Sequence, residues 1–394
     1  MEAIKTINIP DWFDDNLKPL MSLLKGDGEE PQSLLVGGCV RNEILKKPVS
    51  DIDIATKFTP QEVQKILDKN DIQCIPTGID HGTVTVILDK KPYEITTLRK
   101  DVSTDGRRAT IEFSDQWGED AQRRDFTINA LYLDMNGRLY DPLQKGYEDI
   151  QDKKVRFIGN ADQRIQEDYL RVLRFFRFHS YYGEGDIDRD GLKACIKNRE
   201  GVLSLSRERI TNEFFKILLS DNVTEILEIM FSSDILSKVK SDQYEPNFLK
   251  ALLTFQSQKN FEPDNMIKAL TRYFIISGGR AKFYDDLFTF SKKQSSFLVK
   301  LDVMSHKEFY QDERGVKKAM FMHGRELVLQ GYTCLLAQDK IQKSSDLENI
   351  IFKWDIPEYP ITGETLLKEG YKTGPELGQE LERRREEWLD ENLD

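Results

Sequence analysis

The first 150 residues alternate short apolar runs with turn residues, and this pattern predicts a mixture of strands and helices. Several of the runs are rich in β-branched residues, which favours strands. The strands are expected within residues 34–38, 51–56, 83–88, 93–99 and 128–134. Helices are predicted at 40–47 and at 61–70, where Thr59 and Pro60 suit the N-cap and the first helical position.

From about residue 160, apolar side chains recur every three or four positions, which is typical of amphipathic helices. We therefore expect an α+β fold in which a mixed sheet with helices is followed by helices alone. The expected parts are an N-terminal helical segment at 1–30, a sheet domain at 31–150, a helical region at 151–220 and further helices at 221–394. A chain of 394 residues can form two or more packed units.

The composition is that of a soluble globular protein, with 39% hydrophobic and 32% charged residues. No segment approaches the roughly 20 consecutive apolar residues that cross a bilayer. The N-terminus lacks the pattern of a secretion signal or a transit peptide, so a cytoplasmic location is expected. The four cysteines are too dispersed for a metal knuckle and are predicted to be reduced thiols in the core.

A net charge of −11 argues against indiscriminate nucleic-acid binding, which needs a basic surface. Any RNA site is therefore expected to be a local basic patch. One candidate is the segment 153–177, in which cations outnumber acids. Its cations are Lys153, Lys154, Arg156, Arg164, Arg171, Arg174 and Arg177.

Asp51 and Asp53 are the first candidates for chemistry. In a strand, side chains two positions apart share a face, so the two carboxylates would lie side by side while Ile52 and Ile54 face the core. Paired carboxylates suit Mg²⁺ and a two-metal displacement at phosphorus. Glu94 would add a third carboxylate if its strand lies beside the first.

The residues just before this pair strengthen the hypothesis. Gly37 and Gly38 lie between a predicted strand and helix, where a backbone without Cβ atoms can approach a phosphate closely. Arg41 would add a charged donor at the same place. Each element alone has a simpler explanation, because D-x-D patterns also occur in solvated loops and a glycine pair is common.

Residues 164–178 are predicted to form one amphipathic helix. At about 100° per residue, its polar face would face a cleft while its apolar face packs. The polar face would hold Arg164, Glu167, Asp168, Arg171 and Arg174. A solvated face with ion pairs is the alternative explanation.

Asp168 and Arg171, one turn apart on that helix, suggest a sharper role. A carboxylate accepts from the exocyclic amines of cytosine and adenine, whereas uracil and guanine carry a carbonyl at that position. The arginine can donate to a neighbouring ring nitrogen or carbonyl. The pair could therefore accept C and A while leaving polar groups unpaired with U and G.

Two further segments are candidates for nucleotide contacts. Arg123, Arg124 and Asp125 precede a predicted core strand and could bind triphosphate and ribose. The polar segment 101–113 could be a mobile loop near the site or a simple hairpin.

Together these segments closely resemble class II tRNA nucleotidyltransferases, the bacterial-type CCA-adding enzymes and their poly(A) polymerase relatives. The matching motifs run in the family's order from residue 34 to about 215. They are LLVGGCVRNEILKKPVSDIDIAT, HGTVTVIL, YEITTLRKDVSTDGRRATIEF, RRDFTINALYLD, YDPLQKGYEDI, EDYLRVLRFFRF and SRERI.

The resemblance implies a polymerase-β-like nucleotidyltransferase head followed by a helical neck, body and tail, the last two binding the acceptor arm of tRNA. It implies that Asp51 and Asp53 bind two Mg²⁺ ions and that Glu94 is the third catalytic acid. The implied nucleotide-binding residues are Gly37, Gly38, Arg41, Arg123, Arg124, Asp125, Asn129, Glu167, Asp168, Arg171 and Arg174. Asn42 departs from the aspartate that many members have.

The resemblance also implies a flexible loop that helps to switch specificity from CTP to ATP. Its residues here include Asp101, Asp105, Gly106 and Arg107. The presence of such a loop favours addition of the complete CCA end.

The expected function is addition of CCA to the 3′ end of tRNA from CTP and ATP, with release of pyrophosphate by a two-metal mechanism. The alternatives are a poly(A) polymerase, an enzyme that adds only CC or only A, and a non-catalytic RNA-binding protein. A metal-dependent phosphohydrolase is disfavoured because the four histidines are scattered. The sequence predicts tRNA, CTP and ATP as partners, no membrane, and no particular oligomeric state.

Overall fold

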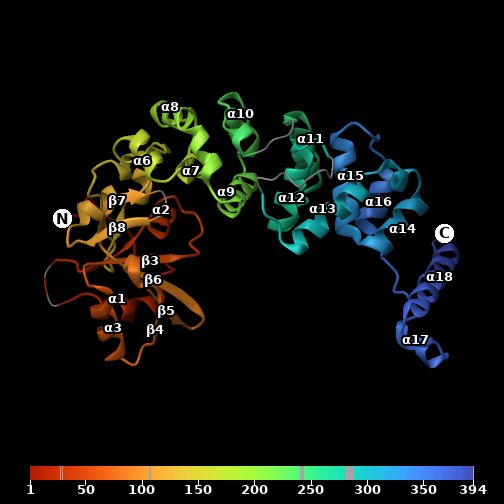
Figure 1. Cartoon of the computed structure of the whole chain (residues 1–394), viewed down its shortest axis with the longest axis horizontal. Helices are drawn as coiled ribbons and strands as arrows, with labels where there is room; N and C mark the ends of the chain where they lie inside the picture. Colours follow the sequence, from red (N-terminus) through yellow and green to blue (C-terminus); the bar gives the residue numbers. More distant parts are fainter. Residues whose placement is uncertain (27, 29, 106–107, 240–243, 280–287, 394) are drawn as a thin grey trace. The chain divides into compact units, whose positions relative to one another are not determined.

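A computed structural model of the protein (Figure 1) describes residues 1–26, 28, 30–105, 108–239, 244–279 and 288–393. Gly106 and Arg107 of the expected flexible loop lie outside these residues. The chain divides into two compact units. The first comprises 1–213, 220–222 and 232–239, and the second 214–219, 223–231 and 240–394. The four-part division expected from the sequence stays a prediction.

An eight-stranded mixed sheet forms the centre of the first unit. In spatial order its strands are β1 (Lys5–Thr6), β10 (Arg138–Tyr140), β9 (Tyr132–Leu133), β2 (Ser33–Val36), β3 (Ile52–Thr56), β6 (Lys91–Thr97), β5 (Thr83–Leu88) and β4 (Cys74–Gly78). Strands β3 and β6 run parallel, whereas the other neighbours in the sheet are antiparallel. The α+β fold with a mixed sheet is confirmed.

Both faces of this sheet carry buried side chains. On one face, Ile52 and Ile54 of β3 are 2% and 0% exposed, as the alternation in the sequence predicts. The other face packs Val36 and Tyr132 against Trp117 in the core. Asp53 lies on this second face, so the carboxylate is at the edge of a packed layer.

Helices surround the sheet and extend the first unit. They are α1 (Leu17–Leu23), α2 (Gly38–Ile44), α3 (Pro60–Asp68), α4 (Trp117–Gln122), α5 (Gly146–Gln151), α6 (Ala161–Glu167), α7 (Leu170–Tyr182), α8 (Arg189–Lys197) and the start of α9 (Arg207–Leu219). Helix α3 begins at Pro60, as predicted. Thr59 is its N-cap, and the side chains of Thr59 and Glu62 form a reciprocal capping box around this first turn.

The second unit is helical throughout its described residues, as expected. Its helices are α10 (Val223–Ser232), α11 (Pro246–Lys259), α12 (Asn265–Ile276), α13 (Lys292–Met304), α14 (Glu313–His323), α15 (Arg325–Ala337), α16 (Ser345–Lys353), α17 (Gly363–Lys368) and α18 (Pro375–Asn392). Trp388 attaches the acidic last helix by packing on Phe321 and Tyr359, with ring centroids 5.5 and 5.6 Å apart. Among the described helices, none is both long and apolar enough to span a bilayer.

Several predicted elements need correction. The single helix expected at 164–178 is wrong, because α6 ends at Glu167 and α7 begins at Leu170; Asp168 between them has extended backbone angles, φ −156° and ψ 107°. The strand expected at 128–134 is reduced to the short β9, because the first residues of this segment belong to a 3₁₀ turn, η2 (Thr127–Asn129).

The N-terminal segment differs in part from expectation, whereas the polar segment 101–113 agrees with one of its two alternatives. Residues 1–30 contain helix α1, but they also contribute strand β1, which pairs with β10. The polar segment belongs to a hairpin of β7 (Arg99–Asp105) and β8 (Arg108–Phe113), which was the simpler of the two alternatives.

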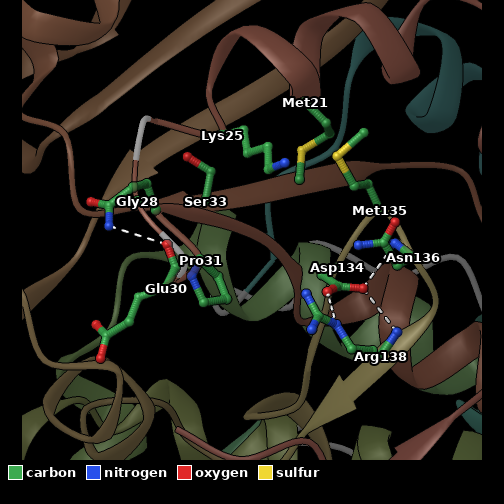
Figure 2. A pocket seen from close by; sticks show the side chains of 11 residues that line it. Met21, Lys25, Gly28, Glu30, Pro31, Ser33, Asp134, Met135, Asn136 and Arg138 are labelled. Carbon is green, nitrogen blue, oxygen red and sulfur yellow. Dashed lines mark hydrogen bonds and ion pairs between the residues drawn. The ribbon is translucent and has the colours of Figure 1, made fainter.

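A small pocket lies between the end of α1 and the turn that joins β9 to β10 (Figure 2). Asp134 and Arg138 form an ion pair at its wall, with Oδ2 and Nε 2.6 Å apart. Its lining in the described part of the chain includes none of the predicted site residues.

Candidate active site

Asp53 and Glu94 are direct neighbours in the parallel pair β3 and β6. Paired residues of adjacent strands project on the same face of a sheet, so the two carboxylates lie on one side. Glu94 is exposed and Asp53 is half-buried. The condition set by the sequence for a third carboxylate, that the strand of Glu94 lies beside that of Asp53, is therefore met.

Asp51 immediately precedes β3, where its carboxylate accepts a hydrogen bond from Ser50 Oγ at 3.0 Å. Burial, and then the negative charge of Glu94, raises the pKa of Asp53 to about 6. Arg124 acts in the opposite direction, while Asp51 adds to the increase. At Asp53, burial and the neighbouring carboxylates together therefore outweigh the effect of Arg124 on the pKa.

This donor set fits a hard divalent cation. Mg²⁺ prefers oxygen ligands and is usually held by one or two carboxylates, with substrate phosphates and water completing its coordination. Within the described residues, no three acidic, histidine or cysteine side chains are gathered tightly enough to hold a metal by themselves. The oxygen ligands that Asp53 and its neighbours offer are of the kind that Mg²⁺ prefers.

Gly37, in the turn between β2 and α2, has a backbone conformation that favours glycine, with φ 76° and ψ −125°. A Cβ atom there would lie 3.5 Å from Arg124 Nη1 and 3.7 Å from Asp53 Oδ2. The turn thus lies close to both charged groups. Gly38 begins α2. Phosphate binding by the two glycines stays a prediction.

Arg41 is 7% exposed and joins three elements. Its guanidinium donates to Asn129 Oδ1 at 2.5 Å, to Asn42 Oδ1 at 2.8 Å and to the hydroxyl of Tyr182 at 2.7 Å. It also stacks on the Tyr182 ring, 4.0 Å from the centroid. Asn42 donates in turn to the carbonyl of Pro48, which an aspartate could not do. These contacts link α2 to η2 and α7, and the predicted contact of Arg41 with nucleotide stays a prediction.

Arg123 and Arg124 share one buried partner, Asp120, which sequence reasoning missed. Asp120 Oδ1 accepts from Arg123 Nε at 2.8 Å, and Oδ2 accepts from Arg124 Nη2 at 2.9 Å and from the hydroxyl of Tyr132 at 2.7 Å. Asp120 precedes the arginines by three and four residues, the spacing of neighbours on a helix, and this spacing could have revealed it.

Asp125 connects the end of this segment to α7. Its Oδ2 accepts from Arg174 Nε at 2.8 Å and Nη2 at 2.5 Å, while Oδ1 accepts from Asn129 Nδ2 at 2.9 Å. Burial alone would raise the pKa of Asp125, but Arg174 and Asn129 outweigh it and hold the pKa at about 2. The carboxylate is therefore ionised and fixed at neutral pH.

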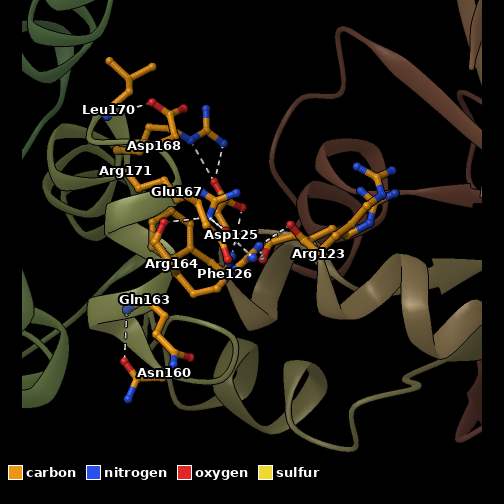
Figure 3. Close-up of polar contacts among 12 residues, drawn as sticks. Arg123, Asp125, Phe126, Asn160, Gln163, Arg164, Glu167, Asp168, Leu170 and Arg171 are labelled. Atoms are coloured by element: carbon orange, nitrogen blue, oxygen red, sulfur yellow. Dashed lines mark hydrogen bonds and ion pairs between the residues drawn. The ribbon is translucent and has the colours of Figure 1, made fainter. Parts of the chain in front are cut away.

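The break between α6 and α7 gathers the other predicted residues (Figure 3). Glu167 Oε2 accepts from Arg171 Nη1 at 2.5 Å and also binds Arg164 Nη1. Arg171 Nη1 donates as well to the carbonyl of Arg164, at 2.7 Å. Within the described residues, the hydrogen bonds of Arg171 all leave from Nη1, so its Nε and Nη2 remain available for a ligand.

Asp168 is held by Arg209 of α9, a second residue that sequence reasoning missed as a site residue. Arg209 Nη1 donates to Asp168 Oδ1 at 3.1 Å and Nη2 to Oδ2 at 2.7 Å, while the backbone N–H of Leu170 also donates to Oδ1. Arg209 lies in the SRERI motif, one of the segments that carry the resemblance. A separation of 41 residues gives no local signal for such a pair.

The basic segment 153–177 is not an unneutralised patch. Each of its seven cations has an acidic partner. The pairs are Lys153 with Glu184, Lys154 with Asp152, Arg156 with Asp149, Arg164 and Arg171 with Glu167, Arg174 with Asp125, and Arg177 with Glu213. The segment therefore organises the unit by ion pairs, and RNA contacts by it stay a prediction.

Asp101 and Asp105 lie in strand β7 of the hairpin. Their part in nucleotide selection stays a prediction. The cysteines agree with expectation: Cys39, Cys195 and Cys334 are buried free thiols, and Cys74 is half-buried.

A mixed sheet that carries paired carboxylates beside an arginine-lined glycine turn defines a nucleotidyltransferase-type head. In agreement, the family described as Poly A polymerase head domain matches residues 33–156. A second family, described as Probable RNA and SrmB- binding site of polymerase A, matches residues 186–243.

Curated relatives match nearly the whole chain. The mitochondrial CCA tRNA nucleotidyltransferase 1 of Homo sapiens is 34% identical over an alignment of 396 residues. The alignment covers 95% of this chain and 86% of the relative. The CCA-adding enzyme of Streptococcus sanguinis is 31% identical over 382 residues, covering 95% and 92%. The chain therefore belongs to the family of CCA-adding tRNA nucleotidyltransferases.

Solved structures agree in fold. The CCA-adding enzyme of Bacillus stearothermophilus in complex with CTP matches with a TM-score of 0.71 and 22% identity, over 97% of this chain and 93% of that one. The Thermotoga maritima CCA-adding enzyme complexed with tRNA matches with a TM-score of 0.61 and 19% identity, over 96% and 93%.

Proposed function

We propose that this protein completes tRNA by adding CCA to its 3′ end from CTP and ATP, with release of pyrophosphate. Relatives that share at least 30% identity with nearly the whole chain are CCA-adding enzymes, which supports this activity. A cytoplasmic location stays a prediction, since the relatives include bacterial and mitochondrial enzymes.

The observation that carries the proposal is the ion pair of Asp125 with Arg174. It ties the segment beside the sheet carboxylates to α7, and α7 follows directly on the turn that carries Asp168. Groups suited to phosphorus chemistry and groups suited to base recognition are therefore linked by this ion pair within the first unit.

The carboxylates of Asp51, Asp53 and Glu94 would hold Mg²⁺. Two such ions, when bound, would activate the 3′-hydroxyl of tRNA for attack on the α-phosphate and stabilise the charge that develops on pyrophosphate. Arg124, beside Asp53 and the Gly37 turn, supplies a fixed positive charge for the triphosphate. Its guanidinium remains charged at every working pH.

Asp168 and Arg171 would select the base. Arg209 and the Leu170 N–H occupy three of the roughly four acceptor positions of the Asp168 carboxylate, and one on Oδ2 remains for an exocyclic amine. The remaining Arg171 donors would bind an acceptor on the same base edge. Cytosine and adenine satisfy both groups, whereas uracil and guanine would set a carbonyl oxygen against the carboxylate.

An incorporation assay tests the proposal and separates the alternatives. A tRNA that lacks its CCA end would be incubated with Mg²⁺ and each labelled nucleotide. We expect C from CTP alone, and a complete CCA end from CTP with ATP. Long tails from ATP alone would instead identify a poly(A) polymerase, and a product that stops at CC would identify a partial enzyme. Absence of any Mg²⁺-dependent incorporation would refute the proposed function.

A further inference from the structure

Asp120 is a buried carboxylate to which the proposed function assigns no task. Its side chain is 1% exposed, and carboxylates are seldom buried so completely unless they are paired. Arg123 and Arg124 supply two nearby positive charges, and the hydroxyl of Tyr132 completes the set of donors. Burial raises the pKa of Asp120, but the two arginines outweigh it and hold that pKa well below its usual range.

The hydrogen bonds of Asp120 fix the orientation of Arg124. Asp120 Oδ2 accepts from Nη2 at 2.9 Å and from Nε at 3.2 Å. The remaining nitrogen, Nη1, lies on the side of Gly37 and Asp53, because a Cβ atom on Gly37 would be 3.5 Å from it. The planar guanidinium is rigid, so holding two nitrogens determines the position of the third.

The backbone of the two arginines is held independently. Arg164 Nη2 donates to the carbonyl of Arg124 at 2.8 Å and also to that of Arg123. The main chain is therefore attached to α6, while the side chains are attached to Asp120. This division leaves Asp120 with a specific task, which is to set the direction of the guanidinium groups.

We propose that Asp120 is a positioning residue that holds Arg124 beside Asp53 and Gly37, where its guanidinium meets the triphosphate of the incoming nucleotide. The inference rests on the proposed function, because it assumes a nucleoside triphosphate at the carboxylates. Only an ionised carboxylate can accept from both arginines at once, since an asparagine would turn an NH₂ group toward one of them.

Asp120→Asn tests the proposal with little change in side-chain volume. We expect the dissociation constant of CTP, measured by equilibrium dialysis without tRNA, to rise about tenfold, the size of effect that loss of a charge-assisted hydrogen bond has on binding. The inhibition constant of cytidine, which has no phosphate, should stay the same. In the incorporation assay, KM for CTP and for ATP should rise more than kcat falls.

Asp134→Asn is a matched control. Asp134 is 6% exposed and, like Asp120, accepts from an arginine four residues later and from a tyrosine, with Arg138 Nε at 2.6 Å and the Tyr140 hydroxyl at 3.2 Å. It lies at the wall of the pocket in Figure 2, whose lining lacks the proposed site residues. We expect this variant to lose thermal stability to a similar degree while its affinity for CTP is unchanged.

Three results would overturn the proposal: unchanged CTP affinity in Asp120→Asn, an equal loss of cytidine affinity, or the same CTP defect in Asp134→Asn. Because CTP binding is measured without turnover, a wild-type protein that binds CTP but adds nothing to tRNA would refute the proposed function and leave the role of Asp120 testable.

Tyr132→Phe provides a second variant in case Asp120→Asn does not fold. It removes one donor from Asp120 Oδ2 but retains the ring, which packs edge-on against Trp117 with centroids 5.3 Å apart. We expect about a twofold to threefold loss of CTP affinity, in keeping with one neutral hydrogen bond, and no change for cytidine. An unchanged CTP affinity in this folded variant would contradict the proposal.

Discussion

Arg209 binds Asp168 through two hydrogen bonds, from Nη1 to Oδ1 at 3.1 Å and from Nη2 to Oδ2 at 2.7 Å. The bidentate pair fixes the plane of the carboxylate at the break between α6 and α7. A base-reading carboxylate must keep its direction, because rejection of the wrong base depends on a carbonyl oxygen meeting a fixed lone pair. On the proposed role of Asp168, Arg209 would therefore take part in base recognition although it projects from another helix.

Replacing Arg209 with glutamine should relax base selection. We expect the preference for CTP over UTP, as a ratio of kcat/KM values, to fall roughly tenfold. In Asp168→Ala the same ratio should fall at least as far. The comparison variant is Arg177→Gln, which breaks the ion pair of α7 with Glu213 on α9 and should cost stability without changing selectivity. Unchanged selectivity in both Arg209→Gln and Asp168→Ala would contradict the proposed role of Asp168 in selecting the base.

Replacing Asp53 with asparagine should separate activity from stability. Its folded-state pKa of about 6 lies above the ordinary value of 3.8, so without metal the ionised carboxylate destabilises the fold above pH 6. We expect Asp53→Asn to melt no lower than the wild type in EDTA at pH 7.5, while incorporation falls roughly a hundredfold or more.

The same pKa sets the pH dependence of that comparison. The melting advantage of Asp53→Asn should shrink as the pH is lowered through 6, where the wild-type carboxyl becomes protonated. Asp51→Ala should likewise lose incorporation with little loss of folding. Retained activity in either variant would contradict the metal assignment.

The ion pair of Asp125 with Arg174 should affect the stability of the protein toward acid. The folded-state pKa of Asp125, about 2, lies below the ordinary 3.8, so the pair contributes stability above about pH 4 that is lost as the pH falls toward 2. Its contribution should be on the order of 2 kcal/mol. Urea unfolding between pH 2.5 and 6 should show a smaller loss of free energy in Asp125→Asn than in the wild type, and equal slopes would refute this.

Gly37→Ala should affect both folding and nucleotide binding. The conformation of Gly37 disfavours any Cβ atom, with a strain of about 1 to 3 kcal/mol, and a Cβ atom there would also touch Arg124 Nη1 at 3.5 Å, beside the proposed triphosphate position. The control is Gly185→Ala, since Gly185 has a similar φ of 68° but no atom within 4 Å of its Cβ position. We expect both variants to lose melting temperature and only Gly37→Ala to lose CTP affinity.

The sequence predicted best where side-chain alternation and local turn chemistry determine the structure. Asp53 and Ile54 point to opposite faces of β3, and Thr59 caps α3, for reasons contained in a few neighbouring residues. The motifs quoted for the family likewise located the head and the helical region that follows.

The sequence predicted less where distant partners decide the outcome. Residues 164–178 have the period of one helix, but Asp168 leaves the helix and binds Arg209, and no local pattern contains that pair. The spacing of Asp120 from Arg123 and Arg124 indicates the two ion pairs, but its burial depends on a distant residue. An acidic residue on a short helix resembles a solvated one until Tyr132, from a strand, is found against it.

The bidentate pairs of Asp125 and Asp168 bear on the order in which this protein becomes active during synthesis. The family's head domain ends at residue 156, yet its Asp125 is held by residue 174 and Asp168 is held by residue 209. A nascent chain that has just completed the sheet therefore lacks the partners that fix its site. On the proposed roles of Asp125 and Asp168, the site is therefore fixed only once Arg174 and Arg209 have been synthesised, and both of these residues lie in the first compact unit.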